Sequence, residues 1–110
     1  MPEIKSRLAF EELRSVNSNT FDGTYKVVGP PMENPIRLFK ITNDSTVGVT
    51  VSFDGGTTDH EYLPAGSFLL IDITSNRVWD CLFALAVATQ ISVKGAAGTG
   101  LVYLSTYYAQ

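Results

Sequence analysis

The 110-residue sequence is poor in the residue types that bind metals and activate nucleophiles, since it contains one cysteine and one histidine. Because Cys81 stands alone, an intramolecular disulfide and a multi-cysteine metal site are excluded within one chain. His60 has no second histidine with which to share a zinc ion, and the sequence shows no base and orienting group arranged around a nucleophile. We therefore predict that the protein is not an enzyme and that it holds no metal or cofactor.

Charged side chains are also scarce, at 17% of the chain, and the formal net charge is −3. The eight lysines and arginines are scattered between Lys5 and Lys94, so no basic stripe is available to neutralise a row of phosphates. We expect no direct contact with nucleic acid. The length, together with 45% hydrophobic residues, is typical of one folded domain with one core.

The sequence has no long apolar run. The longest one, from Cys81 to Ala88, is less than half of the roughly 20 residues that cross a bilayer as a helix. The opening MPEIKSRLAFEELRSV interrupts its apolar positions with Glu, Lys and Arg, so it lacks the apolar centre of a signal peptide. These features predict a protein that is made in the cytoplasm and has no membrane partner.

The dominant pattern in the sequence is the alternation of apolar and polar residues that is typical of β-strands. In TVGVTVSF, residues 46–53, every second residue from Val47 to Phe53 is apolar, which predicts a strand with one buried face. The preceding IRLFKIT, residues 36–42, predicts another strand, and the NDS between them favours a tight turn. We predict that the two strands form an antiparallel hairpin.

Further strand patterns continue to the end of the sequence. SFLLIDIT, residues 67–74, is nearly unbroken in apolar residues, which predicts burial on both faces or at a seam between sheets. Two later runs are separated by the glycine-rich GAAGTG, which predicts a final hairpin over about residues 90–108. Residues 76–88 mix strand-favouring and helix-favouring side chains, and we interpret them as a strand with an irregular start.

Short strands with turn signals about every 8 to 12 residues predict an all-β protein. The predicted fold is an antiparallel β-sandwich, jelly-roll-like, with about seven or eight short strands. It is a single domain over residues 1–110, with an arm and proline-rich lead-in over 1–35 and the sandwich core over 36–110. Within the lead-in, LAFEELRSV at residues 8–16 favours a short helix or an arm.

The most chemically suggestive stretch is SFDGGTTDHEYLPAG, residues 52–66, which gathers three acids around the histidine. A calcium loop would need acids at alternate positions and a bidentate glutamate about twelve residues in, and this stretch lacks that spacing. DGG directly after an alternating strand is typical of a tight reversal, and LPAG is typical of a second turn. We interpret the stretch as two turns, with Asp59, His60 and Glu61 on an exposed rim.

Partner contact is the predicted role of three groups of side chains: apolar residues of the N-terminal segment, the exposed rim, and two tyrosines near the end of the chain. Interfaces are enriched in aromatic residues, and terminal arms can reach a neighbouring subunit. The predicted contact residues are Leu8, Phe10, Leu13, Asp59, His60, Glu61, Tyr107 and Tyr108.

Several segments resemble small virion structural proteins of tailed bacteriophages. They are KITND at residues 40–44, SFDG at 52–55, DHEYLPAGSF at 59–68, DITSN at 72–76 and the closing QISVKG…GTGLVYLSTYYA. The resemblance implies a capsid cement or decoration protein, located on the capsid surface of the virion, that staples neighbouring major capsid subunits and forms a dimer or trimer.

Two alternatives stay open. The first is a neck, adaptor or tail component of the virion, which would use the same sandwich in a ring. The second, from a different class, is a carbohydrate-binding β-sandwich in which Trp79 and the C-terminal tyrosines stack on sugar rings.

Overall fold

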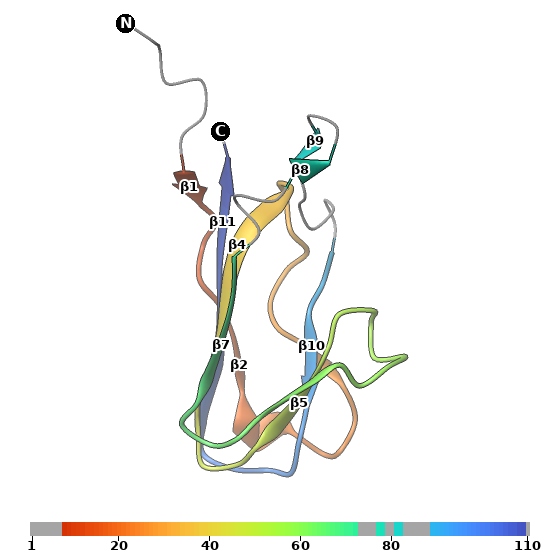
Figure 1. Ribbon diagram of the computed structural model, residues 1–110. Helices are drawn as coiled ribbons and strands as arrows, with labels where there is room; N and C mark the ends of the chain where they lie inside the picture. Colours follow the sequence, from red (N-terminus) through yellow and green to blue (C-terminus); the bar gives the residue numbers. More distant parts are fainter. Residues whose placement is uncertain (1–7, 73–76, 79–80, 83–88, 110) are drawn as a thin grey trace, which may run out of the picture.

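The computed structural model describes residues 8–72, 77–78, 81–82 and 89–109. Apart from a small two-stranded sheet at residues 77–78 and 81–82, their strands form two antiparallel sheets that face each other (Figure 1). The first sheet has the order β1-β11-β4-β7, with β2 also paired to β11. Its strands are β1 (Leu8–Phe10), β2 (Arg14–Asn17), β4 (Ile36–Ser45), β7 (Phe68–Asp72) and β11 (Gly100–Ala109). The second sheet has the order β3-β10-β5-β6. Its strands are β3 (Lys26–Val27), β5 (Val49–Ser52), β6 (Glu61–Leu63) and β10 (Ser92–Lys94).

If β1 and β2 are counted as one strand, consecutive strands of these sheets alternate between the two layers, except that β5 and β6 both lie in the second sheet. β1 and β2 pair in succession with the same strand, β11, and act as one interrupted strand. With that reading, each sheet has four strands, and the connections are those of a jelly roll. The predicted jelly-roll-like antiparallel sandwich is therefore confirmed. The two sheets hold nine strands rather than seven or eight, in part because the first strand is split.

The core fills the space between the inner faces of the two sheets. The alternation predicted from Val47 onward is confirmed, because Val49 and Val51 of β5 are fully buried. They face Phe39 and Ile41 from the inner face of β4, and these four side chains belong to one cluster. The buried hydrophobic residues are Phe21, Val28, Met32, Ile36, Phe39, Ile41, Val49, Val51, Leu63, Ile91, Val93, Val102 and Leu104.

Both predicted hairpins are wrong, because their strands belong to opposite sheets. β4 continues through Ser45 and pairs with β11 and β7, whereas β5 pairs with β10 and β6. The chain likewise crosses from β10 in the second sheet to β11 in the first. Turn-forming residues mark a reversal of the chain, but they do not decide whether the returning strand pairs with its predecessor or crosses to the facing sheet.

Asn43 shows how the β4–β5 crossing is held. This residue is fully buried within β4, opposite Val102, rather than in a tight turn. Its side-chain amide donates to the carbonyl oxygens of Val47, Leu63 and Pro64 at 2.9, 3.1 and 3.2 Å. One side chain thus joins the crossing to the β6–β7 connection.

The short helix proposed for residues 8–16 is also wrong, since this segment forms β1 and β2. An edge of the ten-residue strand β11 offers backbone groups to this segment, and pairing with them satisfies its N–H and C=O groups. Phe21, Val28 and Met32 belong to the core. Residues from Leu8 onward are therefore part of the sandwich rather than an arm beside it.

β7 was expected to be buried on both faces or to lie at a seam between sheets, and only the second alternative is correct. Leu69 and Ile71 pack against the core, whereas Phe68 and Leu70 are 60% and 53% exposed. Phe68 and Leu70 are exposed because only the inner face of β7, the edge strand of the first sheet, meets the second sheet.

The segment interpreted as a strand at residues 76–88 is described at two places, β8 (Arg77–Val78) and β9 (Cys81–Leu82), which pair antiparallel. Trp79 lies outside the described residues. A single-turn 3₁₀ helix, Ser18–Thr20, follows β2. In the part of the chain that is described, no helix has the length and apolar character that crossing a membrane requires.

Candidate functional site

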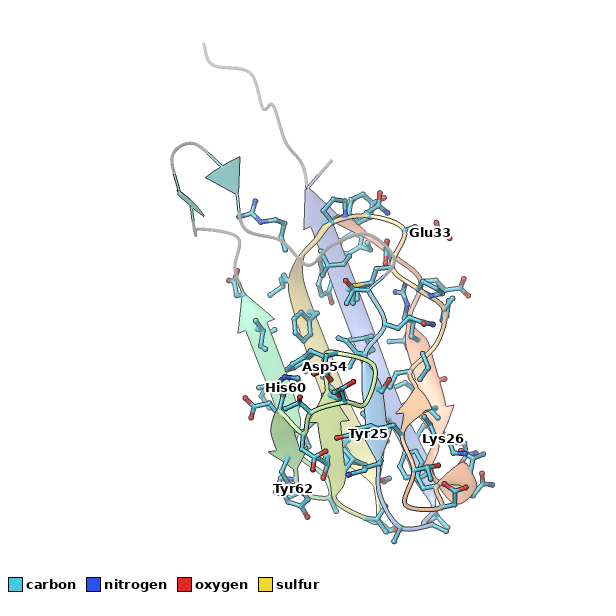
Figure 2. The ribbon with its side chains drawn as sticks, turned by 90° about the vertical axis from the view of Figure 1, so that its right-hand side faces the viewer. Tyr25, Lys26, Glu33, Asp54, His60 and Tyr62 are labelled. Carbon is cyan, nitrogen blue, oxygen red and sulfur yellow. The ribbon has the colours of Figure 1, made fainter. Side chains whose placement is uncertain are left out.

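The loop between β5 and β6, residues 53–60, contains the acids and the histidine that the sequence singles out, and we name it the rim loop (Figure 2). Asp54 organises this loop. Its Oδ1 accepts hydrogen bonds from the Ser52 hydroxyl at 2.6 Å and from the backbone N–H groups of Thr57 and Thr58 at 3.1 and 3.0 Å. These bonds, that from Ser52 above all, hold the pKa of the Asp54 carboxyl well below its usual range.

His60 closes the rim loop on Phe53. Its Nδ1 accepts a hydrogen bond from the Phe53 backbone N–H at 3.1 Å, and the two rings lie 5.3 Å apart. Its backbone N–H donates to the carbonyl of Val51 at 2.9 Å, and its Nε2 lies 4.0 Å from Oδ2 of Asp54. The histidine therefore has a structural explanation: it fixes the return of the chain from β5 to β6.

Asp59 points toward the other strands of the second sheet. It accepts a hydrogen bond from the Tyr25 hydroxyl, and it forms an ion pair with Lys94 of β10 at 3.2 Å. The Lys94 Nζ lies 4.7 Å from the centre of the Tyr25 ring. Desolvation, then the hydrogen bond to Asp59, raises the pKa of Tyr25 to about 12, and the bonds from Tyr25 and Lys94 lower that of Asp59.

The interpretation of this stretch as two turns is confirmed. β5 and β6 are antiparallel neighbours joined by the rim loop, and the Ser67 backbone N–H donates to the carbonyl of Pro64 at 3.1 Å in the second turn. Asp59, His60 and Glu61 are all exposed, as predicted. Within the described ranges, no group of three or more His, Cys, Asp or Glu side chains is placed to hold a metal ion.

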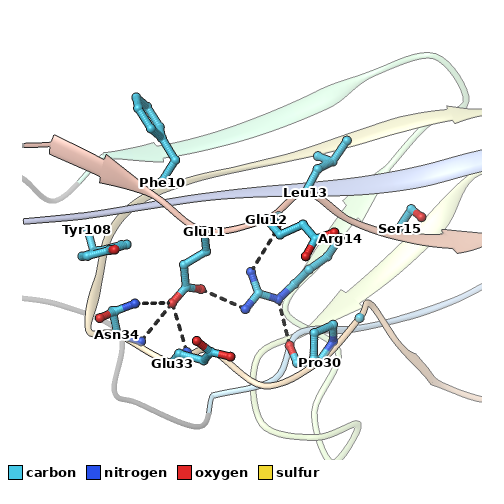
Figure 3. A pocket seen from close by; sticks show the side chains of 11 residues that line it. Phe10, Glu11, Glu12, Leu13, Arg14, Ser15, Pro30, Glu33, Asn34 and Tyr108 are labelled. Carbon is cyan, nitrogen blue, oxygen red and sulfur yellow. Dashed lines mark hydrogen bonds and ion pairs between the residues drawn. The ribbon is translucent and has the colours of Figure 1, made fainter.

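A buried ion pair that the sequence reasoning missed lies at the break between β1 and β2 (Figure 3). The side chains of Glu11 and Arg14 are 7% and 4% exposed, and Oε1 of the acid lies 2.8 Å from Nη2 of the arginine. Glu11 Oε2 accepts hydrogen bonds from the Asn34 amide at 2.8 Å and from the backbone N–H of Glu33 at 3.0 Å. Burial alone would raise the pKa of Glu11, but the bonds from Asn34 and Arg14 outweigh it and lower that pKa.

Arg14 joins three segments of the chain. Its guanidinium donates to the carbonyl oxygens of Pro30 and Pro31 at 2.8 and 3.1 Å and to the Thr106 hydroxyl at 2.9 Å. The pair lies at a pocket of about 460 Å³ between the β1–β2 break and residues 29–34. Because these polar groups bond one another, the arrangement explains how the proline-rich segment is fastened to β11. Residues three apart face opposite sides of a regular strand, so it is the break in register between β1 and β2 that brings Glu11 and Arg14 together, and the sequence does not mark that break.

The outward side of the first sheet is the third candidate, and we name it the outer face. Alternation along each strand turns one set of side chains outward, and four of them are more than half exposed: Phe10, Leu13, Phe68 and Leu70, at 68, 56, 60 and 53%. In Figure 3 Phe10 and Leu13 point away from the buried ion pair. The other outward residues of this sheet's longer strands include Leu38, Lys40, Thr42, Leu101, Tyr103, Ser105 and Tyr107. Exposed apolar and aromatic side chains thus share the outer face with polar ones, among them Lys40, Asp44 and Asp72.

The predicted contact residues divide between two places. On the first sheet, Leu8 pairs with Ala109, and the ring of Phe10 meets that of Tyr107 edge-on at 5.3 Å. Tyr108 instead lines the pocket beside the ion pair and packs against the core. The rim residues Asp59, His60 and Glu61 belong to the second sheet. Comparison with protein-family models, curated proteins and solved structures found no match.

Proposed function

We propose that the chain is a structural protein of a phage virion and acts as a capsid cement or decoration protein on the outer shell. The observation that carries this proposal is the outer face: four large hydrophobic side chains are more than half exposed on one face of a packed jelly roll. Large hydrophobic side chains exposed together on one face are typical of a surface that contacts another folded protein. The resemblance of the KITND, SFDG and DHEYLPAGSF segments supports a virion as the setting.

The rim loop supports the proposal as the surface that would meet the capsid. Its backbone is held by Asp54 and His60, so Glu61 and the loop beside it are presented in one conformation and lose little entropy on binding. A particle that carries many copies of its major capsid protein offers many equivalent positions. A decoration protein that joins two of them gains affinity through effective concentration.

The proposal is tested by adding the purified chain to shells that lack it and measuring occupancy by electron microscopy. Glu61→Lys reverses a charge on the rim, and we expect occupancy to fall because the capsid surface that meets the rim then faces the wrong charge. Glu33→Lys is the matched control, since it reverses an exposed acid that lies away from the rim loop (Figure 2). Failure of the unmodified chain to bind shells would contradict the proposal.

The two alternatives remain predictions that the same experiment separates. Binding confined to the tail vertex would favour a neck, adaptor or tail component. A carbohydrate-binding module would bind glycans in the absence of shells and lose that binding on Trp79→Ala.

A further inference from the structure

The outer face carries a protrusion and a hollow at its two opposite edges. We use the name protrusion for the side chains of Phe68 and Leu70 on the edge strand β7, which are 60% and 53% exposed; at the opposite edge, Phe10 and Leu13 are 68% and 56% exposed and flank the hollow. The hollow, of about 170 Å³, lies at the other edge where the chain passes from β1 to β2 along β11. Its lining residues are Phe10, Glu11, Leu13, Ser105, Thr106 and Tyr107.

The two features lie at the same height along the strands. Leu70 is opposite Lys40 in the β4–β7 register, and Lys40 is opposite Ser105 in the β4–β11 register. Leu13 directly precedes Arg14, which is opposite Leu104, so it lies beside Ser105 as well. A line drawn across the sheet at this height therefore runs from the protrusion to the hollow.

This arrangement is self-complementary. A two-fold axis that runs parallel to the strands, between β4 and β11, places β7 of one copy over β1 and β2 of the other and keeps every residue at its height. Such an axis repeats each contact twice, as an isologous interface requires. We propose that the outer face binds a second copy of this chain in this way, with Leu70 of each copy entering the hollow beside Leu13 of the other.

The size of the outer face agrees with the requirement of a dimer. The first sheet is four strand positions wide, counting β1 and β2 as one, and its longest strands have ten residues. With strands about 4.8 Å apart and about 3.4 Å per residue, the flat area of its outer face is roughly 600 Å². Side-chain relief adds to that figure. The total approaches the roughly 800 Å² per partner that a standard-size interface buries.

The charges on this face are compatible with the same axis. Lys40 lies in the middle of the face, with its Nζ 4.7 Å from the centre of the Phe68 ring. In the two-fold arrangement β4 of one copy lies over β11 of the other, which places Lys40 opposite the hydroxyl of Ser105 rather than opposite another cation. Asp44 and Asp72 lie near opposite ends of the face, so they do not meet each other at its centre.

The test is sedimentation equilibrium of the purified chain and of four variants. Leu70→Lys and Leu13→Glu each replace an apolar contact residue by a charge, and each is expected to raise the dimer dissociation constant at least about tenfold. The double variant places Lys opposite Glu at both contacts and is expected to bind more tightly than either single variant. Within one chain these positions are at opposite edges of the sheet, so this rescue requires a second copy.

Val27→Lys is the control, because Val27 is 44% exposed on β3 of the other sheet, and its dissociation constant should be that of the unmodified chain. A chain that stays monomeric at about 100 µM would overturn the proposal. So would a dimer that neither single variant weakens, for example one formed through the edge of β7. The measurement uses no capsids, so its outcome is independent of the proposed function.

Discussion

At the scale of single residues, the strongest claim concerns Arg14 and Glu11. Both side chains are almost wholly buried, yet both carboxylate oxygens of Glu11 and all three guanidinium nitrogens of Arg14 have a partner from β11 or from the proline-rich segment. A buried pair of this kind is costly to break, because removing one partner leaves the other charge buried without compensation. The pair therefore determines whether residues 30–34 stay on the sandwich.

Arg14→Met is expected to lower the free energy of unfolding by about 3–5 kcal/mol, because Glu11 then keeps its charge in a buried position without the guanidinium. Urea denaturation measures the change. The control is Lys26→Met, which breaks an exposed pair with Asp22 and should lower the free energy of unfolding far less. Equal losses in the two variants would contradict the structural role of the buried pair.

Glu11 also makes a prediction about pH. Its folded pKa lies below the ordinary value of 4.5, so its contribution to stability is complete above that value and is lost as the pH falls through the lowered pKa. The difference in unfolding free energy between the unmodified chain and Glu11→Gln should therefore be constant above about pH 5.5 and shrink toward pH 3. Denaturation at pH 7, 5 and 3 checks it, and a difference that does not change with pH would refute it. Comparing the two proteins cancels the effect of other acids such as Asp54.

At the scale of elements, the crossings between sheets are the part of the fold that needs specific residues. Gly100 begins β11 with φ +98°, and a Cβ at this position would lie 2.2 Å from the carbonyl oxygen of Asp44. Only glycine permits this approach of β11 to the end of β4. The glycines that suggested a hairpin in the sequence thus serve a crossing instead.

Gly100→Ala is expected to cost more than about 2 kcal/mol, because strain from a positive φ adds to a clash with backbone. Gly23→Ala is the matched control: Gly23 also has a positive φ, of 86°, but a Cβ there would meet nothing within 4 Å. Its cost should be about 1 kcal/mol from the backbone conformation alone. Thermal or chemical denaturation compares the two, and a larger loss at Gly23 would show that the close approach is unimportant.

The N-terminal segment makes the second prediction at this scale. Deleting residues 2–16 would remove β1, most of β2 and Arg14, so it would test folding rather than capsid attachment. Deleting residues 2–7 leaves β1 and the buried pair in place. We expect an unchanged unfolding free energy and a reduced occupancy on shells, measured by denaturation and by electron microscopy. Full occupancy would show that these residues take no part in attachment.

The sequence was enough to predict where most strands lie, but it did not predict which strands pair with each other. The period-two pattern from Val47 to Phe53 was enough to predict a strand and its buried face, because side-chain direction alternates in any sheet. Pairing was not predictable, because Asn43 and the glycines near Gly100 suit a tight turn and a crossing equally well. The helix proposed for residues 8–16 failed for a related reason: the free edge of β11 is a property of the whole sheet and leaves no trace in the local sequence.

At the scale of the whole molecule, two surfaces of the jelly roll differ in character. The outer face of the first sheet carries four exposed hydrophobic side chains around a central lysine, and the rim loop of the second sheet is polar and held by its own hydrogen bonds. We propose that the outer face joins two copies and that the rim meets the capsid. This division leaves each dimer with two rims, so one dimer can bind two capsid subunits.

Under the proposed function a tailed phage encodes this chain, and the most direct measurement is a cryo-electron microscopy reconstruction of the particles of that phage. The account predicts density for pairs of jelly rolls on the outer surface of the shell, packed through the sheets that contain β7 and β11, with the rim loops directed at capsid subunits. Particles that lack the protein, or that hold it only at the tail vertex, would contradict the central claim.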